Sequence, residues 1–293
     1  MPVPVPAAVS VRQVLGAAVA ALARAGVTDP QTDAELLLAH VLRRSRGEVQ
    51  AADVRGDVLD AGDADAFARL ADRRAAREPL QHLTGRAPFR HLELRVGPGV
   101  FVPRPETEMV AQLAIDRLRA AASPAPVAVD LGTGSGAIAL SLATEVPHAQ
   151  VHAAENSADA FIWAAENFAE VGAGNARLAF VDLAAAFAEL DGTVTVLVSN
   201  PPYVPDAAVP RDPEVRLFDP PAALYGGEDG LDVVRTLSTV GRRLLHPGGM
   251  IVIEHAEVQG EAVRDLLHAD GWLGAATHRD LTLRDRATTA MRP

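Results

Sequence analysis

The chain has no cysteine in 293 residues and only 4% aromatic residues. The absence of cysteine excludes disulfides, a thiolate metal site and a cysteine nucleophile. No apolar run reaches the roughly 20 residues that a membrane-spanning helix needs, so we expect no membrane partner. The opening Met-Pro-Val-Pro-Val-Pro lacks the basic and continuous apolar regions of a signal peptide. We therefore expect a cytoplasmic protein.

Positive charge is also in deficit, because the formal net charge is −11. A protein that binds mainly by neutralising phosphates has the opposite balance, so we expect no nucleic-acid partner. With 48% hydrophobic and 22% charged residues, the composition is typical of a globular chain. The length suffices for one large or two ordinary domains. The histidines are scattered without metal-ligand spacing, and we predict no metal (His40, His82, His91 and His255).

The first part of the chain predicts a small helical domain over residues 1–78. Ser10 is suited to cap a helix that stops at Gly26, and Asp29-Pro30 opens a second helix. A third helix is expected over about residues 64–77. These three helices carry apolar stripes but no chemical constellation, so we interpret them as a substrate- or partner-binding domain. The basic side chains are interpreted as solvated faces, with a protein-binding face as the alternative (Arg43, Arg44, Arg46, Arg69, Arg73, Arg74 and Arg77).

Residues 79–100 interrupt the helical pattern and predict a hairpin linker, with alternation over 89–96. A new helix is expected after Pro103-Arg104-Pro105-Glu106. The acidic residues of its first turn complement the helix dipole. Arg104 is held stiffly between two prolines, and we expect it to bind substrate at the functional site.

From residue 101 the chain predicts an α/β domain that extends to residue 293. Apolar segments alternate with helical patterns at about 137–145, 158–171 and 231–245. This alternation indicates a Rossmann-like, doubly wound sheet of about seven strands. The predicted parallel strands are Val127–Leu131, Val151–Glu155, Arg177–Asp182, Val194–Ser199 and Met250–His255, followed by a closing pair at 275–279 and 287–291.

The strand Val194–Ser199 ends abruptly at Asn200-Pro201-Pro202-Tyr203. Neither proline has an N–H to donate, so the ladder cannot continue through them. Asn200 therefore lies at the carboxyl end of a strand, where open α/β sheets bind ligands. An amide, a rigid carbonyl and an aromatic ring suit a flat substrate group that carries an NH2. A turn asparagine with a structural Pro-Pro is the alternative, and the stretch alone does not decide between them.

A glycine-rich stretch, residues 130–136 (Asp-Leu-Gly-Thr-Gly-Ser-Gly), follows the first predicted strand. Such glycines allow close approach of a ligand and leave N–H groups free at a helix N-terminus. With Ala137 the stretch also matches the relaxed dinucleotide fingerprint. Asp130 favours S-adenosylmethionine, since a carboxylate can reach a methionine ammonium but would repel a pyrophosphate.

Two later strand ends complete the expected cofactor site. Glu155 can accept hydrogen bonds from ribose hydroxyls, and Asp182 with Leu183 can contact the adenine. For Asp182 a helix N-cap is the alternative. The predicted cofactor-binding residues are Asp130, Gly132, Thr133, Gly134, Ser135, Gly136, Glu155, Asp182, Leu183 and Asn200.

In this order and spacing, these motifs resemble the class I S-adenosylmethionine-dependent amino methyltransferases. Pro79–Gly85 and Phe101–Glu108, with the helical first domain, resemble the release factor glutamine methyltransferase family (PrmC/HemK) over nearly the whole chain. The resemblance implies methyl transfer from S-adenosyl-L-methionine, with S-adenosyl-L-homocysteine as product. It implies as acceptor the glutamine N5 in the Gly-Gly-Gln motif of class I peptide chain release factors. We expect the protein to be a monomer.

The catalytic residues expected from this chemistry are Asn200, Pro201 and Tyr203, and Pro202 and Arg104 join them in binding the substrate. The Asn200 oxygen and the Pro201 carbonyl would accept the two amide hydrogens, while Tyr203 flanks the amide plane. No general base is assigned. Methylation of a ribosomal protein glutamine, or of a DNA or RNA amino group, are the alternatives within this chemistry. A non-catalytic cofactor-binding adaptor fits less well, because the stretch Asn200-Pro201-Pro202-Tyr203 is intact. An NAD-dependent dehydrogenase fits less well, because no catalytic acid pair is evident.

Overall fold

The computed structural model describes residues 9–293, and the chain forms two compact units. The helical unit comprises the residues up to Gly85 together with Arg211–Phe218, and the methyltransferase-like unit comprises Arg86–Pro210 and Asp219–Pro293. The division at residues 78 and 100 stays a prediction, and it did not include the return of residues 211–218 to the helical unit. The expectation drawn from residues 1–6 lies outside the described residues.

The helical unit is built around a core that includes Leu22, Leu37 and Phe67. Ser10 caps the first helix in a capping box with Gln13, and Asp29 caps the second, as predicted. The expectation of three helices was wrong, since the unit also contains helix α3. This helix was missed because its buried stripe consists of Val49 and Ala52 alone. Its helices are α1 Val11–Arg24, α2 Pro30–Leu42, α3 Arg46–Arg55, α4 Ala61–Ala75, α5 Leu80–Thr84 and α9 Pro213–Phe218, and β1 Val9–Ser10 pairs with β2 Val58–Leu59.

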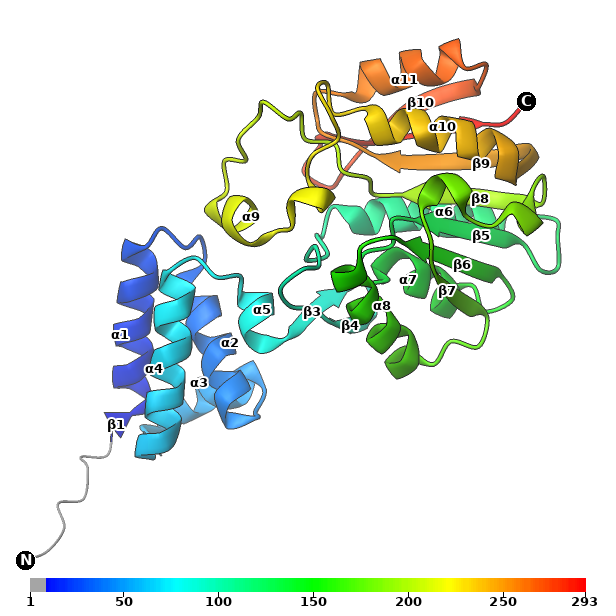
Figure 1. Ribbon diagram of the computed structural model, residues 1–293. Helices are drawn as coiled ribbons and strands as arrows, with labels where there is room; N and C mark the ends of the chain where they lie inside the picture. Colours follow the sequence, from blue (N-terminus) through cyan, green and yellow to red (C-terminus); the bar gives the residue numbers. More distant parts are fainter. Residues whose placement is uncertain (1–8) are drawn as a thin grey trace, which may run out of the picture. The chain divides into compact units, whose positions relative to one another are not determined.

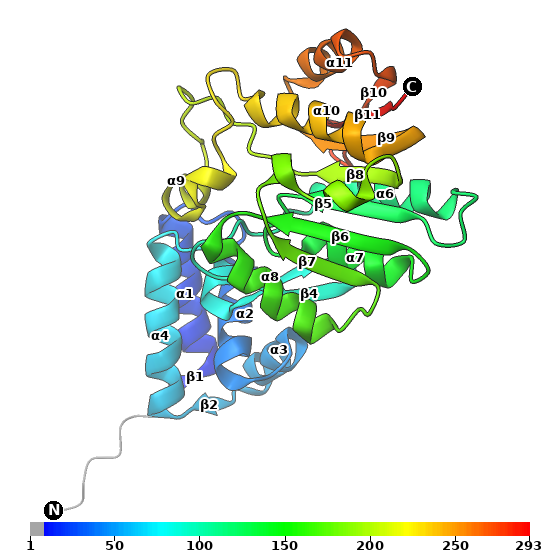
Figure 2. The same cartoon turned by 45° about the vertical axis from the view of Figure 1, so that its right-hand side comes forward.

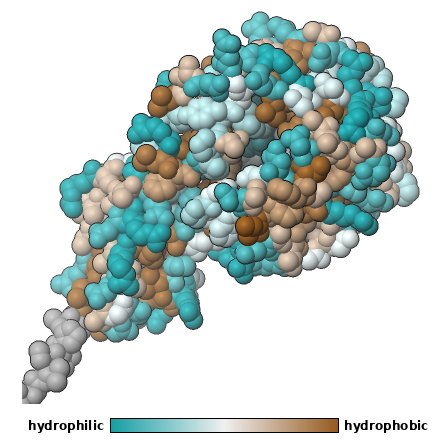
Figure 3. Space-filling model, in the orientation of Figure 1, coloured by the Kyte–Doolittle hydropathy of each residue, from teal (hydrophilic) through white to brown (hydrophobic). Residues whose placement is uncertain are grey.

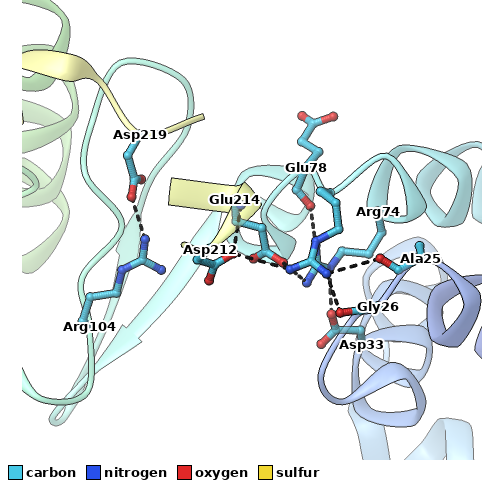
Figure 4. Close-up of polar contacts among 10 residues, drawn as sticks. Ala25, Gly26, Asp33, Arg74, Glu78, Arg104, Asp212, Glu214 and Asp219 are labelled. Atoms are coloured by element: carbon cyan, nitrogen blue, oxygen red, sulfur yellow. Dashed lines mark hydrogen bonds and ion pairs between the residues drawn. The ribbon is translucent and has the colours of Figure 1, made fainter. Parts of the chain in front are cut away.

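The interpretation of the arginines as solvated faces was wrong for Arg74 and Arg77. Arg74 is only 5% exposed, and its guanidinium lies 2.7 Å from both Asp33 and Glu214 (Figure 4). Arg77 also pairs with Glu214, at 2.9 Å. Glu214 lies in α9, on the returning segment 211–218. A buried arginine of the helical unit is thus neutralised partly by an acid 140 residues later in the chain.

The second unit contains a seven-stranded sheet in the order β10-β11-β9-β8-β5-β6-β7. Neighbouring strands from β9 to β7 are parallel, and β11 is antiparallel to both β9 and β10. Figures 1 and 2 show the central strands side by side. The predicted Rossmann-like class I sheet, including the closing strand pair, is confirmed. Its strands are β5 Val127–Leu131, β6 Gln150–Glu155, β7 Ala176–Phe180, β8 Val194–Ser199, β9 Leu245–Glu254, β10 Leu273–Arg279 and β11 Asp285–Met291; a separate hairpin joins β3 Arg86–Phe89 to β4 Leu92–Arg95.

Both faces of the sheet are covered by apolar packing. Val196 and Val198 of β8 lie in the core formed with α6 and α7, whereas Leu197 lies in the core formed with α10 and α11. This two-sided burial explains why β8 reads as a continuous apolar run rather than an alternating one. The helices of this unit are α6 Thr107–Arg119, α7 Ala137–Glu145, α8 Ala158–Val171, α10 Asp232–Leu244 and α11 Gly260–Ala269, with short 3-10 turns η1 Leu183–Ala185, η2 Ala188–Leu190 and η3 Pro221–Ala223.

Hydrophilic residues cover much of the face seen in Figure 3, where apolar residues gather in separate patches. Within residues 9–293, no helix is both long and apolar enough to cross a membrane.

Candidate active site

Two polar segments follow the adjacent parallel strands β5 and β8. Asp130 of β5 is in register with Val198 of β8, so the glycine loop at 132–136 and the Asn200 corner begin at the same edge of the sheet. The Ser199 hydroxyl donates to the Leu131 carbonyl at 2.6 Å and ties the two strand ends together. Because β6 lies on one side of β5 and β8 on the other, this edge is the switch point where open α/β sheets bind ligands.

The glycines of the loop have different local roles. Gly132, Gly134 and Gly136 have φ values of +72°, +59° and +86°, in the left-handed region that favours glycine. A Cβ on Gly136 would approach the Phe168 ring to 2.9 Å, so this glycine serves packing. A Cβ on Gly132 or Gly134 would meet nothing within 4 Å. The loop therefore borders open space where a ligand can approach the backbone.

Asp130 stabilises the glycine loop through hydrogen bonds to the loop and to the helix that follows it. Its Oδ2 accepts hydrogen bonds from the Thr133 hydroxyl at 2.6 Å and from the Ala139 amide at 3.1 Å. The side chain is buried, and no group within residues 9–293 pairs with its Oδ1. Burial raises the pKa of Asp130 to about 7. Asp130 thus has a structural role that the sequence did not reveal, and it keeps one oxygen without a partner.

Glu155, at the end of β6, is more fully engaged than expected. Its Oε1 accepts the amides of Asn156 and Ser157, at 2.9 and 2.8 Å, and its Oε2 accepts the Gly134 amide at 2.8 Å. A carboxylate oxygen has about two acceptor positions, so one position on Oε2 remains for a ligand hydroxyl.

Asn156 connects Asp182 to Glu155. Its backbone amide donates to Glu155 Oε1, and its side chain donates to Asp182 Oδ2 at 3.0 Å. The other oxygen, Oδ1, accepts the Ala184 amide and caps η1. The alternative role of Asp182 as an N-cap is therefore present in the structure. Contact of Asp182 and Leu183 with adenine stays a prediction, as does the binding role of Ser135, whose side chain is buried.

The Asn200 corner leaves two hydrogen-bond acceptors unused. The side-chain Nδ2 of Asn200 donates to the Thr107 hydroxyl oxygen at 3.4 Å, and its Oδ1 has no hydrogen-bond partner within residues 9–293. The Pro201 carbonyl likewise accepts no hydrogen bond from the part of the chain that the structure describes. Asn200 Oδ1 and Pro201 O are the acceptors that the predicted chemistry requires.

The backbone beyond this corner is packed closely from the other side. A Cβ on Gly226 would lie 2.4 Å from the Pro202 carbonyl oxygen, and one on Gly230 would lie 2.3 Å from the Tyr203 carbonyl oxygen. Gln259 also donates to the Tyr203 carbonyl at 2.9 Å. Burial raises the pKa of the Tyr203 phenol above its usual range, so this ring is neutral. These contacts hold the proline corner in one conformation.

Arg104 forms an ion pair with a buried acid of the same unit. Its guanidinium pairs at 2.7 Å with Asp219, whose side chain is fully buried (Figure 4). It also lies over the Phe101 ring, with 5.0 Å to the centroid. Asp219 directly follows the segment 211–218 in the chain. Arg104 therefore anchors the loop that continues from the Asn200 corner, and a direct contact with substrate stays a prediction.

Sequence reasoning missed Glu254, at the end of β9. This residue is 1% exposed, and its carboxyl hydrogen bonds with the Thr107 side chain, the same side chain that Asn200 contacts. Burial raises the pKa of Glu254 to about 7. The available signal was an acid placed in the predicted strand Met250–His255. Within residues 9–293, no cluster of three His, Asp or Glu side chains suits a metal ion.

The sheet, its glycine loop and the Asn-Pro-Pro-Tyr corner define a class I methyltransferase. Two family models match the chain: "PrmC N-terminal domain" over residues 13–85 and "Methyltransferase small domain" over residues 91–220. The release factor glutamine methyltransferase of Streptomyces coelicolor is 49% identical over 92% of this chain and 93% of that protein. The enzyme of the same name from Deinococcus radiodurans is 42% identical, over 96% and 98%. The chain belongs to the release factor glutamine methyltransferase family.

A solved structure shares the fold over most of the chain. The 16S rRNA N2 G1207 methyltransferase of T. thermophilus, in complex with AdoMet and guanosine, matches with a TM-score of 0.52 and 20% identity. The match covers 71% of this chain and 50% of that one. At this identity it shows the shared fold alone.

Proposed function

We propose that this protein methylates the side-chain N5 of the glutamine in the Gly-Gly-Gln motif of class I peptide chain release factors, with S-adenosyl-L-methionine as methyl donor. The observation that carries the proposal is the pair of free acceptors, Asn200 Oδ1 and Pro201 O, at the strand end beside the glycine loop. The family supports a glutamine acceptor in a release factor, since its members bear that name.

The residues of the glycine loop fit the proposed cofactor. The open space beside Gly132 and Gly134 admits a ligand against the backbone, and the partnerless Asp130 Oδ1 suits an ammonium group. The remaining acceptor position on Glu155 suits a ribose hydroxyl, and Asp182 with Leu183 would contact adenine. When bound, the cofactor supplies a methyl group that its sulfonium charge already activates.

The task of the acceptor corner is to make a poor nucleophile react. A carboxamide nitrogen delocalises its lone pair into the carbonyl, so it must be held with that pair directed at the methyl group. Asn200 Oδ1 and Pro201 O would accept its two hydrogens and favour pyramidal geometry. These hydrogens become better donors as the nitrogen gains positive charge, so both hydrogen bonds strengthen in the transition state. The neutral Tyr203 ring would flank the amide, and the displaced proton leaves to solvent.

The proposed protein substrate agrees with the acidic chain, whose net charge is −11 and does not suit nucleic acid as the main partner. The proposal includes a cytoplasmic location and a monomeric enzyme.

One incubation tests the proposal against its alternatives. The purified protein receives S-adenosylmethionine labelled on the methyl group and, in separate tubes, a class I release factor, the same factor with Gln→Ala in its Gly-Gly-Gln loop, a ribosomal protein fraction, and duplex DNA. We expect label in the unaltered factor alone. Label in DNA or in the ribosomal fraction, or equal label in the Gln→Ala factor, would contradict the proposal.

A further inference from the structure

A buried hydrogen-bonded chain leads away from Asn200 into the second unit. Asn200 contacts Thr107, the first residue of α6, and Thr107 contacts Glu254 at the end of β9. Thr107 is 4% exposed and Glu254 1% exposed. The two strands involved are neighbours, with Ser199 of β8 in register with Ile253 of β9. The fold therefore places an acid and a hydroxyl directly behind the acceptor corner.

The order of these groups determines which way the Asn200 amide faces. An asparagine amide has one accepting and one donating end, and the hydrogen-bond network selects between its two orientations. An ionised Glu254 can only accept, so the Thr107 hydroxyl must give it its single hydrogen. Thr107 is then only an acceptor toward Asn200, which must present Nδ2 to it. The Asn200 oxygen consequently faces away from Thr107.

The opposite orientation would be unproductive. It would place the Asn200 NH2 against the NH2 of a substrate amide, a donor against a donor. The substrate hydrogens would then lose one acceptor, and the buried donors would lack partners.

We propose that Thr107 and Glu254 are positioning residues, which hold the Asn200 side-chain amide with its oxygen toward the substrate amide. The inference rests on the proposed role of Asn200 and assigns two residues outside the Asn-Pro-Pro-Tyr motif to the same reaction.

The chain should respond to protonation of Glu254. A protonated Glu254 can donate to Thr107, which frees the hydroxyl hydrogen for Asn200 Oδ1 and allows the unproductive orientation. Glu254 Oε2 is buried and has no hydrogen-bond partner among residues 9–293. The charged or titratable groups that act on this carboxyl are Arg286, Glu106, Asp280 and Tyr203. Burial raises the pKa of Glu254 to about 7, so the protonation of Glu254 takes place near neutral pH.

The test compares Thr107→Val with Thr107→Ser and with Glu254→Gln. Thr107→Val keeps the shape but removes the hydroxyl, and we expect kcat for the release factor to fall about tenfold or more. KM for the factor and the Kd for S-adenosylmethionine should stay within about threefold. Thr107→Ser restores the hydroxyl and should recover most of kcat. The control is Thr239→Val, an exposed threonine of α10 whose hydroxyl donates to the Arg235 carbonyl at 3.3 Å, and this variant should leave kcat unchanged.

The dependence of kcat on pH distinguishes a reversed Asn200 amide from a loss of activity caused by partial unfolding. The wild-type kcat should fall as pH drops through about 7, where Glu254 takes up a proton. Glu254→Gln does not titrate, and its NH2 can donate to Thr107 as the protonated acid does, so its kcat should be low and should lack this fall. If Thr107→Val does not fold, as judged by its thermal melt, this profile decides the matter alone.

The outcomes distinguish this inference from the function on which it rests. Full kcat in Thr107→Val, equal losses in the Val and Ser variants, or an unchanged pH profile in Glu254→Gln would overturn the inference, while an inactive Asn200→Ala would leave the proposed function standing. Full activity in Asn200→Ala would overturn the proposed role of Asn200 and this inference with it.

Discussion

The glycine loop and the Asn200 corner follow neighbouring strands but are built in opposite ways. The loop uses three glycines with positive φ, and its supports come from nearby in the sequence, such as Asp130 and Glu155. The corner uses two prolines, and its supports come from distant segments: Thr107 is 93 positions from Asn200, and Gln259 is 56 positions from Tyr203. A loop that binds a ligand along its backbone needs room, whereas a corner that aims two acceptors at one nitrogen needs rigidity.

The largest expected effect breaks the corner and leaves the loop intact. Asn200→Ala removes one acceptor that strengthens in the transition state, so methylation should fall about 100-fold or more. The affinity for S-adenosylmethionine should stay within about tenfold, because the loop contacts are unchanged. Label transfer and calorimetric titration measure the two quantities. A matching loss of cofactor binding would show that the two segments do not have separate functions.

A smaller effect should come from filling the space beside the loop. Gly134→Ala puts a methyl group where a Cβ meets nothing within 4 Å, and we expect cofactor affinity to fall about tenfold. Gly172→Ala is the matched control, since Gly172 has a similar φ of +64° and equally open surroundings at the end of α8. Both variants should lose about 1–2 kcal/mol of stability from left-handed strain. Equal cofactor affinity in both variants would contradict a ligand at Gly134.

The smallest expected effect is a pH dependence of the loop. Burial raises the pKa of Asp130 from 3.8 to about 7, so the carboxyl of the free protein is protonated below that pH. S-adenosylmethionine should therefore bind about fivefold more weakly at pH 6 than at pH 8, because the neutral acid does not attract an ammonium group. Titrations at both pH values measure this difference. Asp130→Asn should bind weakly at both.

The same pKa shift has a consequence for stability. A raised pKa in the folded state means that the favourable contribution of Asp130 is complete below its unfolded pKa and is lost as pH rises through about 7. The unliganded wild type should thus lose free energy of unfolding between pH 5 and pH 8. Asp130→Asn should lose less, and the difference between the two losses should be on the order of 2 kcal/mol. Thermal melts at both pH values check this, and parallel losses in the two proteins would contradict it.

The sequence predicted the ends of β5 and β8 well, because each apolar run is followed closely by glycine or proline: Gly132 after β5, and Pro201-Pro202 one residue after β8. It predicted less about the partners of each side chain. Arg74 reads as one of several surface arginines, yet its acid Glu214 lies 140 positions away. Thr107 was visible within its motif, but only the fold brings it to Glu254. Contacts that depend on long chain separation leave no local pattern.

The missed helices illustrate the same limit at the level of secondary structure. Helix α3 buries only Val49 and Ala52, and α11 begins without a side-chain cap and buries only Gly260, Val263 and Leu267. Such short stripes do not stand out from the surrounding polar sequence. Packing against neighbouring elements contributes to the stability of both helices, and α3 also begins with a capping box of Ser45 and Glu48.

The return of residues 211–218 to the helical unit limits how this protein can be divided. The chain passes between the units after Gly85, after Pro210 and again after Phe218. A fragment of residues 86–293 would retain Glu214 without Arg74, and a fragment of residues 1–85 would retain Arg74 without Glu214. Separating a buried ion pair costs about 3–5 kcal/mol, so neither fragment is a self-contained module. Because residues 1–85 and 211–218 form one unit, a single crossover in the gene between them would exchange Arg74 without Glu214, so the two segments must be inherited together.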